Sequence, residues 1–150
     1  MKEIIIEAKT FEEARKKLKD ARQKNPDSLV GFTSYDDELN RKVLEKEKID
    51  FLIIPLSERK DFMKQRNSGF NQVLAKEAKK KVVVIGINID DIIKENKFEK
   101  AKIFARARQN VKLCNKNKIQ MKFFGKNANT HDLKALGLVL GMPTWMTKEL

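Results

Sequence analysis

The sequence predicts an α/β fold in which βα units alternate around a parallel sheet. Short apolar runs rich in β-branched residues recur along the chain, and the clearest, residues 82–85, is unbroken, as is typical of a strand buried on both faces. Each run is followed by a segment whose apolar residues have helical spacing. This alternation favours βα units with right-handed crossovers. No linker interrupts it, so residues 1–150 are expected to form a single βα-repeat domain.

The first half of the chain supplies three of the expected strands. Thr10 is expected to cap the first helix, with Glu13 completing a capping box, and residues 34–37 to cap the second. After the residues Asn67, Ser68 and Gly69, which break the chain, a third helix is expected to present the apolar stripe Phe70, Val73, Leu74 and Ala78. The expected strands are 4–7, 29–33 and 49–55, and the first two helices are 11–23 and the segment ending near 47.

The second half continues the same alternation. Asp90 and Asp91 are expected to cap a short helix, and a longer helix is expected over about 98–116. A fifth strand at 119–124 leads into a polar turn at 125–129. Thr130 is then expected to cap a helix that runs to about residue 140 and ends at Gly141.

Five strands are too few for an eight-stranded barrel. The sheet is therefore expected to be either an open doubly wound layer or an incomplete barrel. In both arrangements functional groups gather at the carboxyl ends of the strands. Those ends carry Ser34, Pro55, Asn88 and Gly125.

Composition and motifs exclude several classes of protein. No apolar stretch approaches the ~20 residues of a membrane span, and the start MKEIIIEAKT lacks a signal-peptide layout, so a cytoplasmic protein without a membrane partner is expected. The single cysteine, Cys114, and the single histidine, His131, leave no metal-ligand cluster of recognisable spacing. The acidic pairs 36–37 and 90–91 stand where helices favour acidic caps. We therefore expect no catalytic residue, no metal and no bound cofactor.

Positive charge is concentrated in one segment. The net charge is +12, and residues 100–131 contain nine basic residues and no acidic one. On the predicted long helix, Lys102, Arg108, Lys112 and Lys116 lie opposite an apolar face. A solvated surface is the plainer interpretation, but helices of that kind usually interleave glutamates with lysines to gain ion pairs. The segment therefore favours contact with a polyanion such as RNA or DNA.

Three stretches in order resemble a known family. RNSGFNQVLAKEAKKKVVVIGINIDDII, FEKAKIFARARQNVKLCNKNKI and DLKALGLVLGM are similar to motifs of the archaeal ribonuclease P protein component 3 family, whose members are relatives of the thirty-kilodalton eukaryotic subunit. The resemblance covers about residues 49–146. It implies a TIM-barrel-like fold, shortened or incomplete here, because the family is usually longer than 200 residues. His131 stands where the family commonly has arginine, and Gln72 where some members have histidine.

The resemblance also implies a function. The chain would be a non-catalytic subunit of the ribonuclease P endoribonuclease, which removes 5′ leaders from precursor tRNA, with the catalytic Mg²⁺ in the RNA subunit. Its partners would be the ribonuclease P RNA, protein component 2 and the other subunits, with precursor tRNA met indirectly. Bare strand edges would need covering, so a homo-oligomer is a further hypothesis. The expected RNA-binding residues are Arg66, Lys76, Lys100, Arg106, Arg108, Lys112 and Lys122.

Two other functions stay open from the sequence. One is a stand-alone metal-dependent phosphoesterase on a barrel, against which the single histidine argues. The other is an interaction scaffold whose basic face meets an acidic protein.

Overall fold

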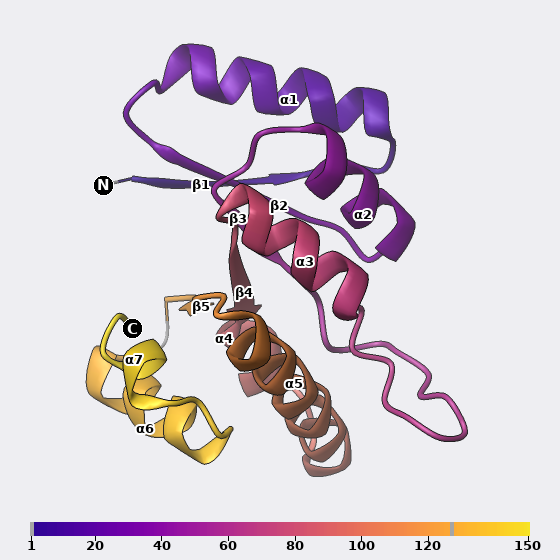
Figure 1. Ribbon diagram of the computed structural model, residues 1–150, viewed down its shortest axis with the longest axis vertical. Coiled ribbons are helices and arrows are strands. Elements are labelled where there is room, and N and C mark those ends of the chain that lie inside the picture. Colours follow the sequence, from indigo (N-terminus) through magenta and orange to yellow (C-terminus); the bar gives the residue numbers. More distant parts are fainter. Residues whose placement is uncertain (1, 127) are drawn as a thin grey trace.

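The structure, a computed structural model, describes residues 2–126 and 128–150 and contains a five-stranded parallel sheet (Figure 1). Its strands are β1 (Glu3–Glu7), β2 (Leu29–Thr33), β3 (Phe51–Ile53), β4 (Val84–Asn88) and β5 (Met121–Phe124). Its helices are α1 (Phe11–Lys24), α2 (Asp37–Lys46), α3 (Gln72–Lys81), α4 (Ile89–Ile93), α5 (Lys97–Asn117), α6 (Thr130–Val139) and α7 (Thr144–Thr147). The predicted α/β class, with alternating strands and helices, is confirmed.

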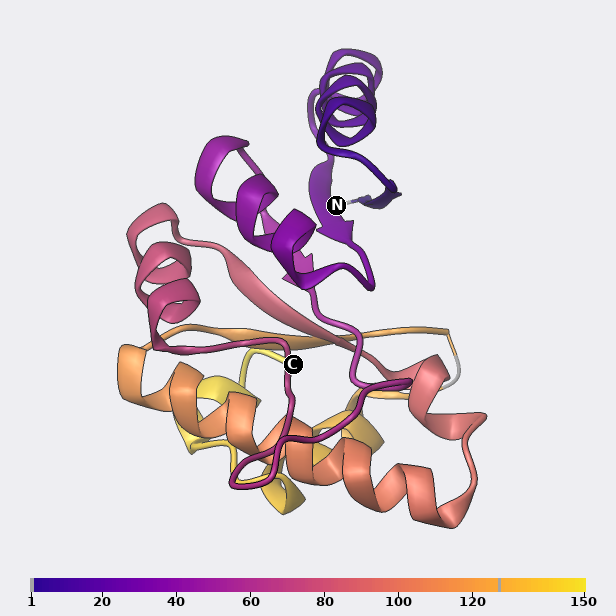
Figure 2. The same cartoon turned by 90° about the vertical axis from the view of Figure 1, so that its right-hand side faces the viewer.

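The strand order decides between the two expected arrangements of the sheet. The strands follow one another as β1-β2-β3-β4-β5, and every neighbouring pair is parallel. Right-handed crossovers between successive neighbours all turn the same way, so they place the connecting helices on one face. Figure 2 shows α1, α2, α3 and α5 side by side on that face. This is the arrangement of part of a βα-barrel, because a doubly wound sheet would reverse its strand order.

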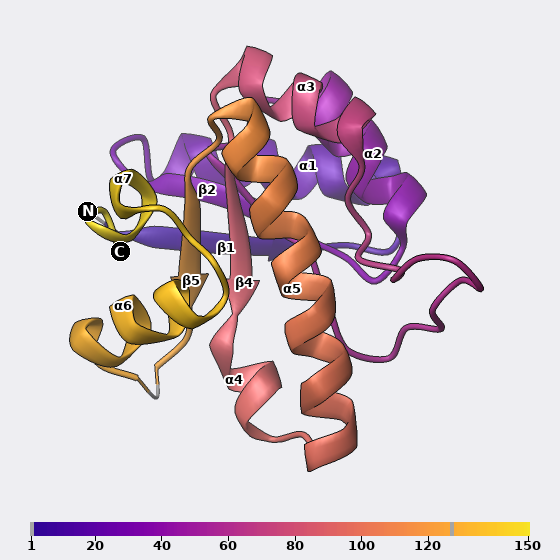
Figure 3. The same ribbon diagram turned by 60° about the horizontal axis from the view of Figure 1, so that its bottom comes forward.

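The face of the sheet under the helices carries the main core. Val30, Phe32, Leu52, Ile85 and Met121 are fully buried there and pack against the apolar sides of the helices. Successive residues of a strand point to opposite faces, so the residues between these positions point to the other face of the sheet. Beyond β5, helices α6 and α7 lie beside the last strand (Figure 3). In the part of the chain that the structure describes, no helix is both long and apolar enough to cross a bilayer.

The opposite face of the sheet has a small aromatic core of its own. Phe51 and Phe124 stack with their ring centroids 4.5 Å apart, and Ile53 packs with them. Gly31, the neighbour of Phe51 across β2 and β3, makes room for this stack, since a Cβ there would lie 2.0 Å from Cε2 of Phe51. The absence of a side chain at Gly31 thus allows the ring to lie across the sheet.

An ion pair connects the first strand with the last. Lys122 of β5 donates to the carboxylate of Glu3 at the start of β1, and its ammonium lies 5.4 Å from the ring centroid of Phe124. Because Lys122 and Phe124 are two residues apart on one strand, they share the face opposite the helices. The pair therefore spans the concave side of the sheet between its two edge strands.

The first helix begins as the sequence predicts. Thr10 Oγ1 accepts a hydrogen bond from Glu13 N at 3.2 Å, and Glu13 Oε2 accepts one from Lys9 N at 3.2 Å. The bond from Glu13 N satisfies an N–H group that the first helical turn leaves free, and the bond from Lys9 N ties the preceding residue to the helix. The predicted cap is confirmed, with the glutamate bonding one residue earlier than a standard capping box requires.

The boundary between α3 and β4 differs from the prediction. Val82 was expected inside the strand, but it ends the helix in the left-handed conformation, with φ of 56°. Val82 is also 83% exposed. Val83 N donates to Ala78 O at 2.9 Å, which closes the last helical turn. The strand starts only at Val84 because the helix must first satisfy its terminal carbonyl groups.

The start of α3 was also predicted too early. Asn71, rather than Asn67 or Ser68, caps the helix by accepting a bond from Leu74 N at 2.9 Å. The buried side of α3 also differs from the predicted stripe. Val73, expected in the stripe, is 63% exposed, whereas Ala75 is fully buried.

Three further boundaries carry an asparagine cap that the sequence interpretation assigned elsewhere or left out. Asn88 caps α4, while Asp90 and Asp91 lie in its first turn; Asn96 caps α5; and Asn129, rather than Thr130, caps α6. Asparagine and aspartate are about equally good at this position, which explains the confusion. Helix α7, which follows Pro143, was not predicted, and Asn127, within the expected turn, lies outside the described residues.

Candidate nucleic-acid interface

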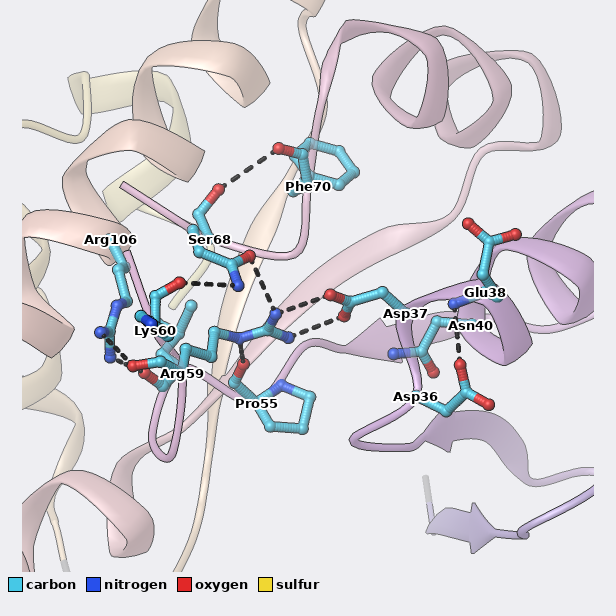
Figure 4. Close-up of polar contacts among 12 residues, drawn as sticks. Asp36, Asp37, Glu38, Asn40, Pro55, Arg59, Lys60, Ser68, Phe70 and Arg106 are labelled. Carbon is cyan, nitrogen blue, oxygen red and sulfur yellow. Dashed lines mark hydrogen bonds and ion pairs between the residues drawn. The ribbon is translucent and has the colours of Figure 1, made fainter. Parts of the chain in front are cut away.

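The connection between β3 and α3, residues 54–71, is a long loop anchored by arginine. Arg106 of α5 has a side chain that is only 1% exposed. Its Nη1 donates to Leu56 O and its Nη2 to Arg59 O, each at 2.8 Å, while its Nε donates to Asp61 Oδ1 at 3.0 Å. Figure 4 shows Arg106 beside Arg59. The planar guanidinium suits this task because it presents several donors in a fixed geometry. Arg106 therefore fixes the path of the loop over α5.

A second arginine ties the same loop to α2. Arg59 donates from Nη1 and Nη2 to the two carboxylate oxygens of Asp37, at 2.7 and 2.8 Å, and from Nε to Pro55 O at 2.5 Å. Figure 4 shows the bidentate pair. Gly69, with φ of +71°, lies against this guanidinium, and a Cβ there would come within 2.4 Å of Arg59 Nη2. Glycine at this position thus permits both the turn and the close approach.

Asp61 joins the two sides of the loop around its tip. Its carboxylate accepts bonds from Arg106, from the backbone N–H of Asn67 at 3.0 Å and from Arg66 Nη1 at 2.9 Å. Burial alone would raise the pKa of this carboxyl, but the bonds from Arg106, Asn67 and Arg66 outweigh it and hold the pKa at about 2. Asp61 is therefore ionised at neutral pH and keeps the loop closed.

A groove of about 680 Å³ lies between this loop, α2, the start of α3 and α5. Lys112 and Lys116 of α5, one helical turn apart, line it together with Arg66 from the loop. Both lysines are exposed, and among residues 2–126 and 128–150 neither forms an ion pair. We call these three residues and the cavity that they line the basic groove.

The α2 side of the basic groove is mixed in charge. Asp37 lines it, but its carboxylate is engaged by Arg59. Glu38 and Arg41 also line it, with 4.0 Å between Arg41 Nη1 and Glu38 Oε2, and Arg41 Nε donates to Glu45 at 3.0 Å. The uncompensated charge of the groove thus comes from the part of α5 that follows Glu99, where the sequence has no further acid.

The structure brings together two of the seven predicted RNA-binding residues. Arg66 and Lys112 line the basic groove. Arg108 is exposed one turn earlier on α5, with its Nη2 3.5 Å from Val139 O, and does not line the groove. Lys76 is exposed on α3, and Lys100 is half-buried in the first turn of α5.

Two of the seven lie where the prediction did not place them. Arg106 was expected to be available to phosphate, and this is wrong, because it is 0% exposed and all three of its bonds anchor the loop. Lys122 lies in a strand, as expected, but its ammonium is paired with Glu3 on the face of the sheet opposite the helices. Phosphate at Lys122 would have to displace that carboxylate.

Some contributors to the groove escaped the sequence interpretation. Lys116 was placed on the basic face but not among the predicted contacts, although it follows Lys112 by one turn. Phe62, from the loop, lines the groove and is 58% exposed. The pairing of Arg59 with Asp37 joins residues 22 positions apart, and no local pattern marks it.

Two other titratable groups that the sequence singled out, Asp36 and Cys114, have structural roles. Asp36 caps α2 by accepting bonds from Glu38 N and Leu39 N. Burial raises the pKa of the Cys114 thiol to about 12, so it is neutral in the core. No group of three or more His, Cys, Asp or Glu side chains in the described part of the chain is placed to hold a metal ion.

Two curated proteins are similar to this chain in sequence. No family model matches the chain. Ribonuclease P protein component 3 of Methanococcus maripaludis strain C7 is 27% identical over 147 residues, and so is that of strain C6. Each alignment covers 98% of this chain but 60% of the relative, so the chain spans about three fifths of the length of these curated proteins.

A solved structure has the same fold. A chain in the cryo-EM structure of archaeal ribonuclease P with mature tRNA superposes with a TM-score of 0.78 at 23% identity. The match covers 97% of this chain and 62% of that one. By sequence the chain is thus similar to ribonuclease P protein component 3, and its fold is that of a chain in archaeal ribonuclease P.

Proposed function

We propose that this chain is a protein subunit of ribonuclease P that binds the ribonuclease P RNA and supports removal of 5′ leaders from precursor tRNA. The observation that carries the proposal is the basic groove, in which Lys112, Lys116 and Arg66 converge on a chain related to protein component 3. Lys112 and Lys116, which form no ion pair among the described residues, are suited to phosphate, because they can neutralise it while counterions are released.

The proposed contribution is architectural and electrostatic. Phosphate contacts fix register and orientation but carry no sequence information, so the protein would position RNA rather than read it. In this account the bond-breaking step, with its Mg²⁺, belongs to the RNA subunit. The groove walls are held by the Arg106–Asp61 and Arg59–Asp37 pairs, so the lysines are presented from a preformed surface.

The proposed partners are the ribonuclease P RNA, protein component 2 and the remaining subunits of the complex. Support comes from the relatives' name and from the structural neighbour, a chain of ribonuclease P with mature tRNA. Strands β1 and β5 each pair with a single strand in the described sheet, so a partner has two edges on which to add. A second copy of this chain is the other candidate for covering an edge.

Reconstituted cleavage of precursor tRNA tests this function. The assay combines ribonuclease P RNA and protein component 2 with the wild-type chain, with Lys112→Ala plus Lys116→Ala, or with no further protein. The proposal predicts that the wild-type chain stimulates cleavage, that the double variant loses most of the stimulation, and that the chain alone cleaves nothing.

The control variant is Lys16→Ala plus Lys19→Ala on α1, which removes the same charge from a helix away from the groove (Figure 1). It should stimulate like the wild type. Cleavage by the purified chain without RNA would support a phosphoesterase and refute the assignment. Equal loss in both double variants would show that only total charge matters.

A further inference from the structure

The basic groove contains an aromatic side chain that phosphate binding does not use. Phe62 lines the groove and is 58% exposed, although a phenyl ring gains about 2 kcal/mol when it is fully buried. Its neighbour Met63 is fully exposed but does not line the groove. A large apolar ring at the wall of a cationic groove suits a partner that is both apolar and anionic.

The backbone around Phe62 is held in place. Phe62 N donates to Gln65 O at 3.0 Å, which closes a tight turn at the tip of the loop. The residue before it, Asp61, is bound by Arg106 and Arg66. The position of the ring is thus set by the anchored base of the loop, so its exposure is built into the fold.

The groove also offers polar groups beside the ring. Gln65 lines it with an exposed side chain whose amide can donate and accept hydrogen bonds. Lys112 and Lys116 line the same cavity from the α5 side. Its volume of about 680 Å³ is within the range of small-molecule sites, which are typically ~300–1,000 Å³.

We propose that the basic groove accepts an unpaired nucleotide of RNA, with its base stacked on Phe62 and its phosphates at Lys112 and Lys116. This inference rests on the proposed function and adds the class of RNA that the groove recognises. A base has a flat π-face that suits an exposed phenyl ring, and the flanking phosphates suit the lysines. A duplex keeps its bases stacked inside, so only a loop, bulge or single strand can present one.

Charge favours RNA over a protein as the occupant. The cations of α5 that line the groove form no ion pair within the described residues, so a strongly anionic ligand gains most from them. A protein surface would have to place carboxylates opposite two lysines while also filling the space over the ring. An RNA strand supplies both features at every nucleotide.

The test compares two RNAs with the full-length chain. Fluorescence anisotropy measures the affinity for an unstructured 12-nucleotide oligoadenylate and for a 12-base-pair duplex, at one salt concentration. The variants are Phe62→Ala, Phe62→Trp, and Met63→Ala as the control on the same loop. Circular dichroism and thermal unfolding check that each variant folds.

The proposal predicts that Phe62→Ala weakens binding of the single strand about tenfold, within the effect of losing one stacked base, and changes duplex binding less than about twofold. Phe62→Trp should bind the single strand as tightly as the wild type or more tightly, and Met63→Ala should have no effect. Equal effects of Phe62→Ala on both RNAs, or none on either, would overturn the stacking role. So would unchanged RNA affinity with weakened binding to protein component 2.

The two proposals fail separately in this experiment. Lys112→Ala plus Lys116→Ala should weaken binding of both RNAs, because phosphate contacts do not depend on pairing. If that variant binds both RNAs normally, the phosphate role and the function built on it are refuted, whatever Phe62 does. If the lysine variant binds both RNAs more weakly but Phe62→Ala binds the single strand normally, the phosphate role stands and the stacking role is refuted.

Discussion

Arg106 Nε donates to Asp61 Oδ1 at 3.0 Å, joining the middle of α5 to a loop residue 45 positions earlier in the sequence. The same guanidinium donates to the carbonyl groups of Leu56 and Arg59. The most deeply buried cation of the protein therefore shapes the groove that exposed cations line. It acts on the surface without touching a ligand.

Replacement of Arg106 should unfold the loop and destabilise the protein. Arg106→Ala removes three donors and leaves Asp61 partly buried without its main partner, a type of change that costs about 3–5 kcal/mol. Urea denaturation should show that loss in the free energy of unfolding. Arg108→Ala, two residues away but exposed, is the matched control and should change stability by less than about 0.5 kcal/mol. Similar losses in both variants would contradict the anchoring role.

The low pKa of Asp61 predicts an acid-dependent stability. Its folded pKa of about 2 is below the usual 3.8, so the ionised form stabilises the fold above about pH 4, and this contribution disappears as the pH falls toward 2. The shift corresponds to about 2 kcal/mol. Asp61→Asn should therefore be less stable than the wild type by about that amount at pH 7, with the gap closing in acid. A gap that is constant between pH 7 and pH 2 would show that ionisation of Asp61 is unimportant.

The left-handed Val82 offers a stabilising substitution. A β-branched residue with φ of 56° is strained, and its side chain is 83% exposed, so it gains little packing in return. Val82→Gly should raise the free energy of unfolding by about 1 kcal/mol, in the range of strain at such positions. Val73→Gly, at an exposed position inside α3, should lower it by about 0.5 kcal/mol. Thermal unfolding of the two variants should thus move in opposite directions.

The contact between Gly31 and Phe51 predicts a coupled pair of mutations. Gly31→Ala places a methyl group against the Phe51 ring and should cost about 1–3 kcal/mol, as overpacking usually does. In a Phe51→Leu background the ring is gone, so the same change should cost less. A double-mutant cycle on unfolding free energies measures the difference. Additive costs would mean that the clash is relieved elsewhere.

Local patterns predicted the fold more completely than the site. The alternation of strands and helices and the Thr10 cap depend on neighbours in sequence, and the structure confirms them. Helical spacing also predicts that Arg106 is buried. It follows Ile103 by three residues and precedes Asn110 by four, so it falls on the buried face of α5. Counting its charge without its place on the helix led to the wrong assignment.

The groove itself could not be predicted from the sequence. It exists because the 54–71 loop folds back over α5, and the bonds that hold it there, between Arg106 and Asp61 and between Arg59 and Asp37, join residues far apart in the chain. The prediction that Val82 belongs to a strand failed for a related reason. Helix α3 ends on a left-handed residue, and no glycine or asparagine marked that position in the sequence.

The salt dependence of RNA binding tests the central claim that the basic groove holds RNA phosphates. For about five phosphate contacts, the logarithm of the affinity for ribonuclease P RNA should fall with the logarithm of salt concentration with a slope of about −4, and Lys112→Ala plus Lys116→Ala should flatten that slope by about 2. Lys16→Ala plus Lys19→Ala should leave it unchanged. The same slope for all three proteins would contradict the claim.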